Sequence, residues 1–261
     1  EDIDSALSQP GKKHLLGGGN PSRIPKCEQI FRDAMISILN NGSQFEMLTG
    51  NYDGAKGNSE FIALLTTFFR DKCGWDVQSD NICITNGSQS SFQSLFNLFS
   101  GHWSDGSTKK ILLPLAPEYI GYSDLGLGKE IFKAFKPKIS RINDYEFKYN
   151  IDFDALSITN DIGAITVSRP TNPTGNVITN DELIMLYELS IEHGIPLILD
   201  CAYGAPFPNI IFNKTEGFWK ENIILCLSLS KLGLPGLRTG IVLGPKSVIQ
   251  NITAANAIYS L

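Results

Sequence analysis

The stretch SLSKLGLPGLRTG, residues 228–240, places Lys231 directly after the apolar run IILCL. Lysine seldom stays in apolar surroundings unless it is paired or used chemically. Desolvation lowers the pKa of an amine, and the neutral amine is the nucleophile that Schiff-base chemistry requires. Lys231 is therefore a candidate for covalent chemistry with a carbonyl group.

Asp200 ends an apolar run in LILDCAYGAPFP, and Tyr203 follows three residues later. Desolvation penalises a carboxylate at the end of a buried strand unless a cation faces it. A cationic nitrogen on a ligand satisfies that need, although a helix cap or a turn is the ordinary use of a single aspartate. Tyr203 either reaches the same pocket with its hydroxyl or packs as a core aromatic.

The segment ITNGSQSSFQSLF, residues 84–96, indicates a strand, a glycine turn and a helix. Gly87 permits the turn, while Ser88 and Gln89 open a helix whose free N–H groups and positive dipole end suit a phosphate. Ser88 as a simple helix cap is compatible with this interpretation. The sequence contains neither G-x-x-x-x-G-K-[ST] nor G-x-G-x-x-G, which disfavours P-loop and Rossmann nucleotide sites.

The segment SRPTNPTGNVIT, residues 168–179, follows the apolar run GAITV. Two X-Pro pairs and a glycine fix an irregular backbone there, from which the amide of Asn172 can bind an acceptor. A phosphate site, a carboxylate that suits a cationic nitrogen, an amide and a lysine together match a pyridoxal phosphate pocket. In such a pocket, Asp200 keeps the ring nitrogen protonated.

The elements that must position these groups follow from the alternation of strand-length apolar runs with helical segments, which is typical of a parallel sheet covered by helices. We expect strands at 81–85, 109–115, 163–168, 195–200 and 222–228, and helices within 61–70, 91–100 and 181–194. Helices near 26–40 and 245–259 flank this block, and their position at its two ends suggests a different packing unit. Open α/β sheets bind ligands at the carboxyl ends of their strands, where the candidate residues collect.

Composition narrows the class of protein. The 261 residues are 42% hydrophobic and 19% charged with a net charge of −5, which is typical of a soluble globular protein and disfavours nucleic acid and membrane partners. No signal peptide opens the sequence, and five scattered cysteines predict reduced thiols in the cytoplasm. No metal-ligand pattern links the three histidines, His14, His102 and His193.

Motif order and spacing carry a resemblance over nearly the whole chain. LGGGNP, NYDGAKG, TNGSQ, PLAPEY, NPTG, DCAYGAPF and SLSKLGLPGLRTG resemble fold type I pyridoxal phosphate enzymes of the aspartate aminotransferase superfamily, most of all the branch acting on valine and pyruvate. The resemblance implies an α/β fold with a three-layer αβα large domain, a mainly parallel sheet and a small domain whose C-terminal part is largely absent. It divides the chain into an arm with part of the small domain (1–45), the cofactor-binding domain (46–245) and the start of a connecting helix (246–261).

The same resemblance implies roles around a pyridoxal 5′-phosphate ring. Lys231 would form the Schiff base and shuttle protons, and Asp200 would pair with the ring nitrogen. Asn172 and Tyr203 would bind the phenolic oxygen of the ring, with Tyr203 counted among the catalytic residues. Tyr119 would stack on the ring.

The implied phosphate contacts are Gly87, Ser88, Gln89, Ser228 and Arg238. Tyr52 would reach the phosphate of a neighbouring subunit, which implies a homodimer with shared active sites. Gly19, together with Asn172, would lie beside the substrate. Arg238 follows Lys231 by seven positions, one fewer than in much of the superfamily, so a tighter loop is expected.

The expected reaction is amino transfer between an aliphatic amino acid of the valine or alanine type and a 2-oxo acid such as pyruvate. The arginine with which the family binds the substrate carboxylate is expected outside these 261 residues. One alternative is therefore an inactive cofactor-binding fragment. A β-eliminating carbon–sulfur lyase is another, because it shares the pocket, and a cofactor-sensing regulatory module is disfavoured by the lack of a basic helix-turn-helix segment.

Overall fold

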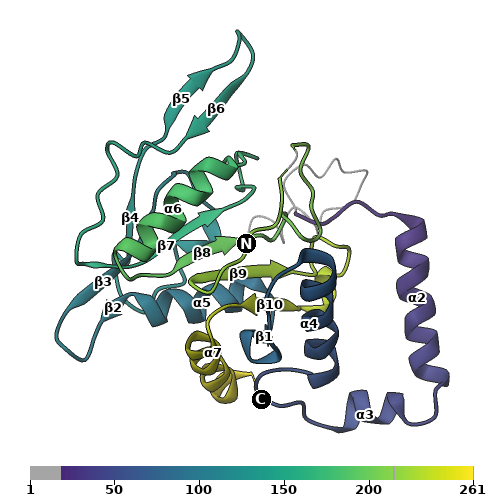
Figure 1. Cartoon of the computed structure of the whole chain (residues 1–261). Coiled ribbons are helices and arrows are strands. Elements are labelled where there is room, and N and C mark those ends of the chain that lie inside the picture. The colour runs from purple at the N-terminus through teal and green to yellow at the C-terminus, as the bar shows by residue number, and fades with distance from the viewer. Residues whose placement is uncertain (1–18, 214, 261) are drawn as a thin grey trace, which may run out of the picture.

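The computed structural model describes residues 19–213 and 215–260, and one sheet of eight strands organises them (Figure 1). The strand order is β1, β10, β9, β8, β7, β3, with β2 and β4 both paired to β3. The strands are β1 (Ile82–Thr85), β2 (Gly101–His102), β3 (Thr108–Leu113), β4 (Phe132–Ala134), β7 (Ile162–Ser168), β8 (Leu197–Asp200), β9 (Ile223–Ser228) and β10 (Gly240–Leu243). Strands β4, β3, β7, β8 and β9 are parallel, whereas β10 runs antiparallel to both neighbours.

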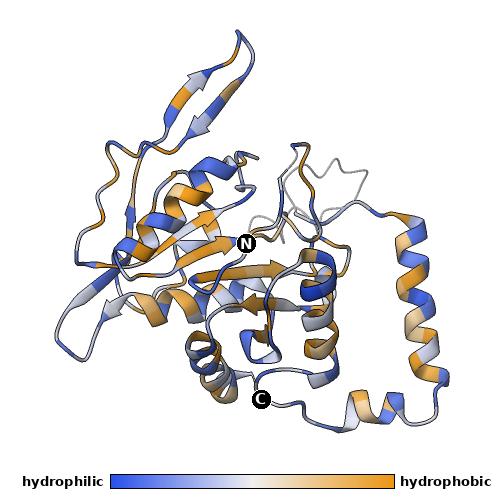
Figure 2. Cartoon of the chain, in the orientation of Figure 1, coloured by the Kyte–Doolittle hydropathy of each residue, from blue (hydrophilic) through white to orange (hydrophobic). Residues whose placement is uncertain are grey.

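Helices cover both faces of this sheet, which confirms the predicted three-layer αβα architecture. They are α4 (Ser59–Cys73) and α6 (Asn180–Glu192) on one face, and α5 (Ser88–Phe99) and α7 (Lys246–Tyr259) on the other. Within β8, Leu197 and Leu199 join the apolar cluster with α4 and α6, whereas Ile198 joins the cluster with α5 and α7. Strands buried on both faces explain the uninterrupted apolar runs of the sequence, visible as orange strands in Figure 2.

Local sequence signals set the helix ends. The side chain of Asn58 accepts a hydrogen bond from the backbone N–H of Phe61 to begin α4, and Gly74 ends that helix at φ +68°. Helix α6 begins with a capping box, in which Thr179 and Glu182 each bind the other's backbone N–H. Each of these end signals depends on residues close together in sequence, and the two helices contain most of the helical segments expected at 61–70 and 181–194.

Helix α7 differs from the expectation of a separate packing unit at 245–259. Val248, Ile249 and Ile252 are buried in the same apolar cluster as α5 and the strands. Strand β10, a run of four residues, was not predicted from the sequence. It begins at Gly240, where a Cβ atom would lie 2.5 Å from the carbonyl carbon of Gly87. The glycine therefore lets β10 approach the turn that precedes α5.

Two parts lie apart from the sheet (Figure 1). Helices α2 (Pro25–Asn40) and α3 (Gln44–Gly50) bury no side chain, and a hairpin of β5 (Lys138–Arg141) and β6 (Phe147–Asn150) projects from the sheet. Three short 3-10 helices, η1 (Ser79–Asn81), η2 (Ile120–Tyr122) and η3 (Pro235–Leu237), complete the described elements. Within the described ranges, every helix is too short or too polar to cross a membrane.

Candidate active site

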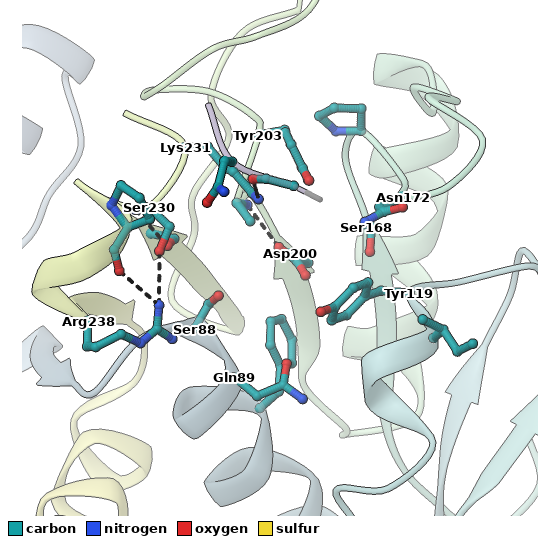
Figure 3. Close-up of a pocket in the computed structure, with 18 residues that line it drawn as sticks. Ser88, Gln89, Tyr119, Ser168, Asn172, Asp200, Tyr203, Ser230, Lys231 and Arg238 are labelled. Atoms are coloured by element: carbon teal, nitrogen blue, oxygen red, sulfur yellow. Dashed lines mark hydrogen bonds between the residues drawn. The ribbon is translucent and has the colours of Figure 1, made fainter. Parts of the chain in front are cut away.

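A cavity of about 490 Å³ opens at the carboxyl edge of the parallel strands (Figure 3). Ser168, Asp200 and Ser228, the last residues of β7, β8 and β9, reach it from below. The sequence-predicted residues that line it are Gly19, Ser88, Gln89, Tyr119, Asn172, Asp200, Tyr203, Ser228, Lys231 and Arg238. The fold thus gathers groups from segments far apart in the sequence at one edge of the sheet.

Lys231 enters the cavity from the loop that follows β9. It is half-buried rather than enclosed by apolar residues, since the buried run ends at Ser228. Its ammonium donates a hydrogen bond to the carbonyl of Gly19 and lies 5.2 Å from the centroid of the Tyr203 ring. A Cβ atom at Gly19 would approach Nζ to 3.1 Å, so a glycine there leaves the amine room to move.

Positive groups converge at one end of the cavity. The guanidinium of Arg238 donates to the carbonyl of Pro235 over 3.2 Å and lies 3.4 Å from the Ser230 hydroxyl. Gly87, at φ +90°, ends the turn before α5, and a Cβ atom there would lie 2.4 Å from Nη2 of Arg238. Only glycine allows the guanidinium to sit against the positive end of the helix, and an anion bound beside both groups would offset their mutual repulsion.

A buried carboxylate stands in another part of the cavity. Asp200 is 8% exposed, and burial raises the pKa of its carboxyl group. Its oxygens accept hydrogen bonds from the Tyr122 hydroxyl at 2.6 Å and from the backbone N–H of Ala202 at 2.8 Å. Among the described residues no ion pair includes Asp200, so its charge is available to a cationic group on a ligand.

Several polar groups face the cavity without a partner in the described chain. The amide of Asn172 and the hydroxyls of Tyr203, Tyr119 and Ser88 form no hydrogen bond to any other described residue. The Gln89 amide instead donates to the carbonyl of Gly121 at 2.7 Å and fixes the loop that carries Tyr119.

Three polar groups at or next to the cavity escaped the sequence analysis. Ser168 and Ser230 line the cavity, and Tyr122 lies behind Asp200. Serine and tyrosine carry no spacing signal here, although the GY that follows PLAPEYI could have drawn attention to Tyr122. Tyr52 is not brought to the cavity of its own chain and is 91% exposed.

Neither of the two histidines that the structure describes lines this cavity. His102 pairs with Thr108, His193 pairs with the carbonyl of Leu189, and His14 lies outside the described residues. No group of three or more potential metal ligands occurs in the part of the chain that the structure describes.

Together these features define the class. Arg238 and the start of α5 offer donors suited to a phosphate, the Asp200 carboxylate suits a protonated ring nitrogen, and the Lys231 amine lies within the same cavity. This donor set suits pyridoxal 5′-phosphate, and the arrangement is that of a fold type I pyridoxal phosphate enzyme.

The comparisons with known proteins agree. The family model "Aminotransferase class I and II" matches residues 44–260, and the chain belongs to this pyridoxal phosphate-dependent family. The chain is 50% identical over all 261 residues to a valine–pyruvate aminotransferase of Escherichia coli (strain K12) and covers 62% of that relative. It therefore spans less than two thirds of that protein's length.

Solved structures support the same assignment. A valine-pyruvate aminotransferase from Salmonella typhimurium LT2 matches 95% of this chain with a TM-score of 0.86 and 47% identity, and 61% of that chain is covered. An aspartate aminotransferase double mutant from Thermus thermophilus matches 94% of this chain, and 60% of its own, with a TM-score of 0.71 at 20% identity. The second likeness shows the fold alone.

Proposed function

We propose that this protein transfers an amino group between an aliphatic amino acid of the valine or alanine type and a 2-oxo acid such as pyruvate. The observation that carries the proposal is the 50% identity, along the whole chain, to a valine–pyruvate aminotransferase. The site agrees with it, because the residues selected from the motifs line one cavity.

The residues present suggest how the cofactor is held. Arg238, Ser88 and the first N–H groups of α5 bind the phosphate, and Asp200 pairs with the ring nitrogen. Asn172 and Tyr203 supply free polar groups for the ring oxygen. The remaining proposed contacts are Gly87, Gln89 and Ser228 at the phosphate and Tyr119 on the face of the ring. When bound, the cofactor supplies an electron-accepting ring that stabilises negative charge on the substrate Cα.

The chain's own residues then divide the remaining work. The Lys231 amine would take the proton from the substrate Cα and deliver it to the C4′ carbon of the cofactor, and in the second half of the reaction it would move a proton in the opposite direction. Its half-buried position on a loop, beside Gly19, gives the amine the freedom this movement needs. Gly19 and Asn172, which both line the cavity, are the proposed contacts of the substrate.

We also propose a homodimer in which Tyr52 reaches the phosphate of the partner's site. Tyr52 is 91% exposed, and α2 and α3 expose apolar side chains such as Leu39 and Leu48. Both features suit a surface that another subunit covers. The cytoplasm is the proposed location, since the five cysteines are free thiols in the structure.

The test uses the full-length protein with pyridoxal 5′-phosphate. We expect a visible absorbance band, a pyridoxyl group mapped to Lys231 after borohydride reduction, and alanine formed from valine and pyruvate. A label on a different lysine would contradict the assigned site. Release of ammonia and a thiol from a cysteine-type substrate, without alanine formation, would replace the transferase with a β-eliminating lyase.

A further inference from the structure

A second carboxyl group lies close to the site and has no role in the function proposed above. Glu118 precedes Tyr119 and accepts two hydrogen bonds from Ser168, one from the backbone N–H at 2.9 Å and one from the hydroxyl at 2.5 Å. Ser168 is 2% exposed and stands beside Asp200 on the neighbouring parallel strand. A buried strand end thus presents both a hydroxyl and an N–H group to Glu118.

The contacts continue from Ser168 to the cofactor carboxylate. The Tyr122 hydroxyl lies 3.3 Å from the Ser168 hydroxyl and donates to Asp200 at 2.6 Å. Tyr122 is 2% exposed, and its ring packs against Phe92, Phe96 and Tyr119. Four polar groups therefore form one continuous relay, which runs from the half-buried Glu118 through the buried Ser168 and Tyr122 to Asp200.

Each hydroxyl has a single proton to donate, so the protonation state of Glu118 decides in which direction the hydrogen bonds of the relay point. When Glu118 is ionised, the Ser168 hydroxyl donates to it, and the Tyr122 oxygen receives no proton from Ser168. When Glu118 is protonated, its O–H can donate to Ser168, whose proton then turns toward Tyr122. Tyr122 now donates to Asp200 as the last of three donors in series, and each bond polarises the next. Asp200 is a weaker base in this second arrangement.

The charge of Glu118 acts in the same direction as the relay. An ionised Glu118 adds a negative charge near Asp200 and makes that carboxylate a stronger partner for a cation. We propose that Glu118 is a positioning residue whose protonation state, passed through Ser168 and Tyr122, sets how strongly Asp200 holds the cationic ring nitrogen of the cofactor. This inference rests on the proposed function.

Glu118 is the group that changes charge near neutral pH. Burial of its carboxyl group raises its pKa to about 7, with a smaller contribution from Asp200. The other titratable or charged groups that face the relay or its end are Tyr119, Tyr122, Arg169, Asp200, Cys201, Cys226, Lys231 and Arg238. Burial raises the pKa of Tyr122 and of both thiols well above neutral pH, so they stay uncharged.

The test compares cofactor affinity in Glu118→Gln and wild-type full-length protein between pH 6 and pH 8. Gln keeps the size and a hydrogen-bonding amide but cannot ionise. For each pH, the Kd of Glu118→Gln for pyridoxal 5′-phosphate is divided by the Kd of wild type. Titration of the ligand itself cancels in this ratio. We expect the ratio to rise from about one at pH 6 to about fivefold at pH 8. A ratio that stays constant over this range would overturn the proposal.

A second variant tests the route. Ser168→Ala keeps the carboxyl group of Glu118 and removes the hydroxyl between Glu118 and Tyr122. Because that hydroxyl lowers the pKa of Glu118, its loss moves ionisation of Glu118 to higher pH, and the comparison in this background extends to pH 9. We expect the effect of Glu118→Gln to lose most of its pH dependence in this background. An undiminished effect would show that Glu118 acts through space and would overturn the relay. Ser168→Ala alone should also change the pH profile of wild-type affinity, a result that needs no variant at position 118.

Glu146→Gln serves as the matched control, because Glu146 is exposed between β5 and β6 and its carboxylate binds only Asn143 among the described side chains. Its affinity ratio to wild type should stay near one at every pH. If wild-type protein fails to bind the cofactor at all, the proposed function fails. If wild-type protein binds and the Glu118→Gln ratio is flat, only the relay fails.

Discussion

The two ends of the cavity are built in different ways. The anion end combines the turn at Gly87, the start of α5 and the loop that carries Arg238, and its guanidinium is exposed. The acid end joins Glu118, Ser168 and Asp200 from three separate segments, with Ser168 and Asp200 buried and Glu118 half-buried. The first end gives its groups freedom to meet a ligand, whereas the second holds a charge in fixed geometry before any ligand arrives.

Lys231→Ala should have the largest effect on turnover. It removes the group that moves the proton and leaves the anion end and the acid end of the cavity intact. We expect turnover to fall by about 10³-fold or more, since general acid–base and nucleophilic roles are lost together. Cofactor affinity should fall far less, as measured by equilibrium titration. The control is Lys220→Ala, at an exposed lysine just before β9. Appreciable turnover in Lys231→Ala would contradict the assignment.

Asp200→Asn breaks the acid end. The substitution keeps the side-chain shape but removes the charge opposite the ring nitrogen, so we expect turnover to fall by about 100-fold. Without cofactor, the same variant should unfold at a higher temperature than wild type, because a buried carboxylate with no cation is unfavourable. Thermal unfolding with and without pyridoxal 5′-phosphate measures both effects. A lower unfolding temperature of the cofactor-free variant would count against this account.

This contrast also explains what the sequence could and could not predict. The strands at β7, β8 and β9 and the residues Asp200, Asn172 and Lys231 were predictable, because apolar runs mark the strands and each residue follows one closely. The link between Glu118 and Ser168 was not, since the two residues are 50 positions apart and meet only through the sheet. Local patterns predict which groups reach the edge of a sheet, and tertiary packing decides which of them touch.

Removing the exposed guanidinium of Arg238 should reduce activity less than removing the buried carboxylate of Asp200 does. Arg238→Gln removes the charge at the anion end, and we expect cofactor affinity to weaken by about 10- to 100-fold, the value of a charge-assisted phosphate contact. At saturating cofactor, turnover should largely recover, because the acid end and Lys231 are unchanged. Arg141→Gln on the exposed strand β5 is the control. Turnover that stays low at saturation would mean that Arg238 does more than hold the cofactor.

The smallest expected effect is on stability: ionisation of Glu118 at the acid end should lower the free energy of unfolding. Burial raises the pKa of Glu118 from 4.5 to about 7, so the folded protein favours the protonated form. Stability contributed by this group is full below pH 4.5 and is lost as the pH rises toward 7. Because Glu118 is partly exposed, we expect this loss to be about 1 to 2 kcal/mol rather than the value of the full shift.

Glu118→Gln cannot titrate, so its free energy of unfolding relative to wild type should increase between pH 4.5 and 7 in cofactor-free protein. Urea unfolding at several pH values measures this difference, with Glu146→Gln as the variant at an exposed position. A difference that is the same at both pH values would show that Glu118 ionises as readily in the folded protein as in the unfolded chain. In that case only the carboxylate of Asp200 would be destabilised by burial, and the two carboxyl groups at the acid end would not be coupled.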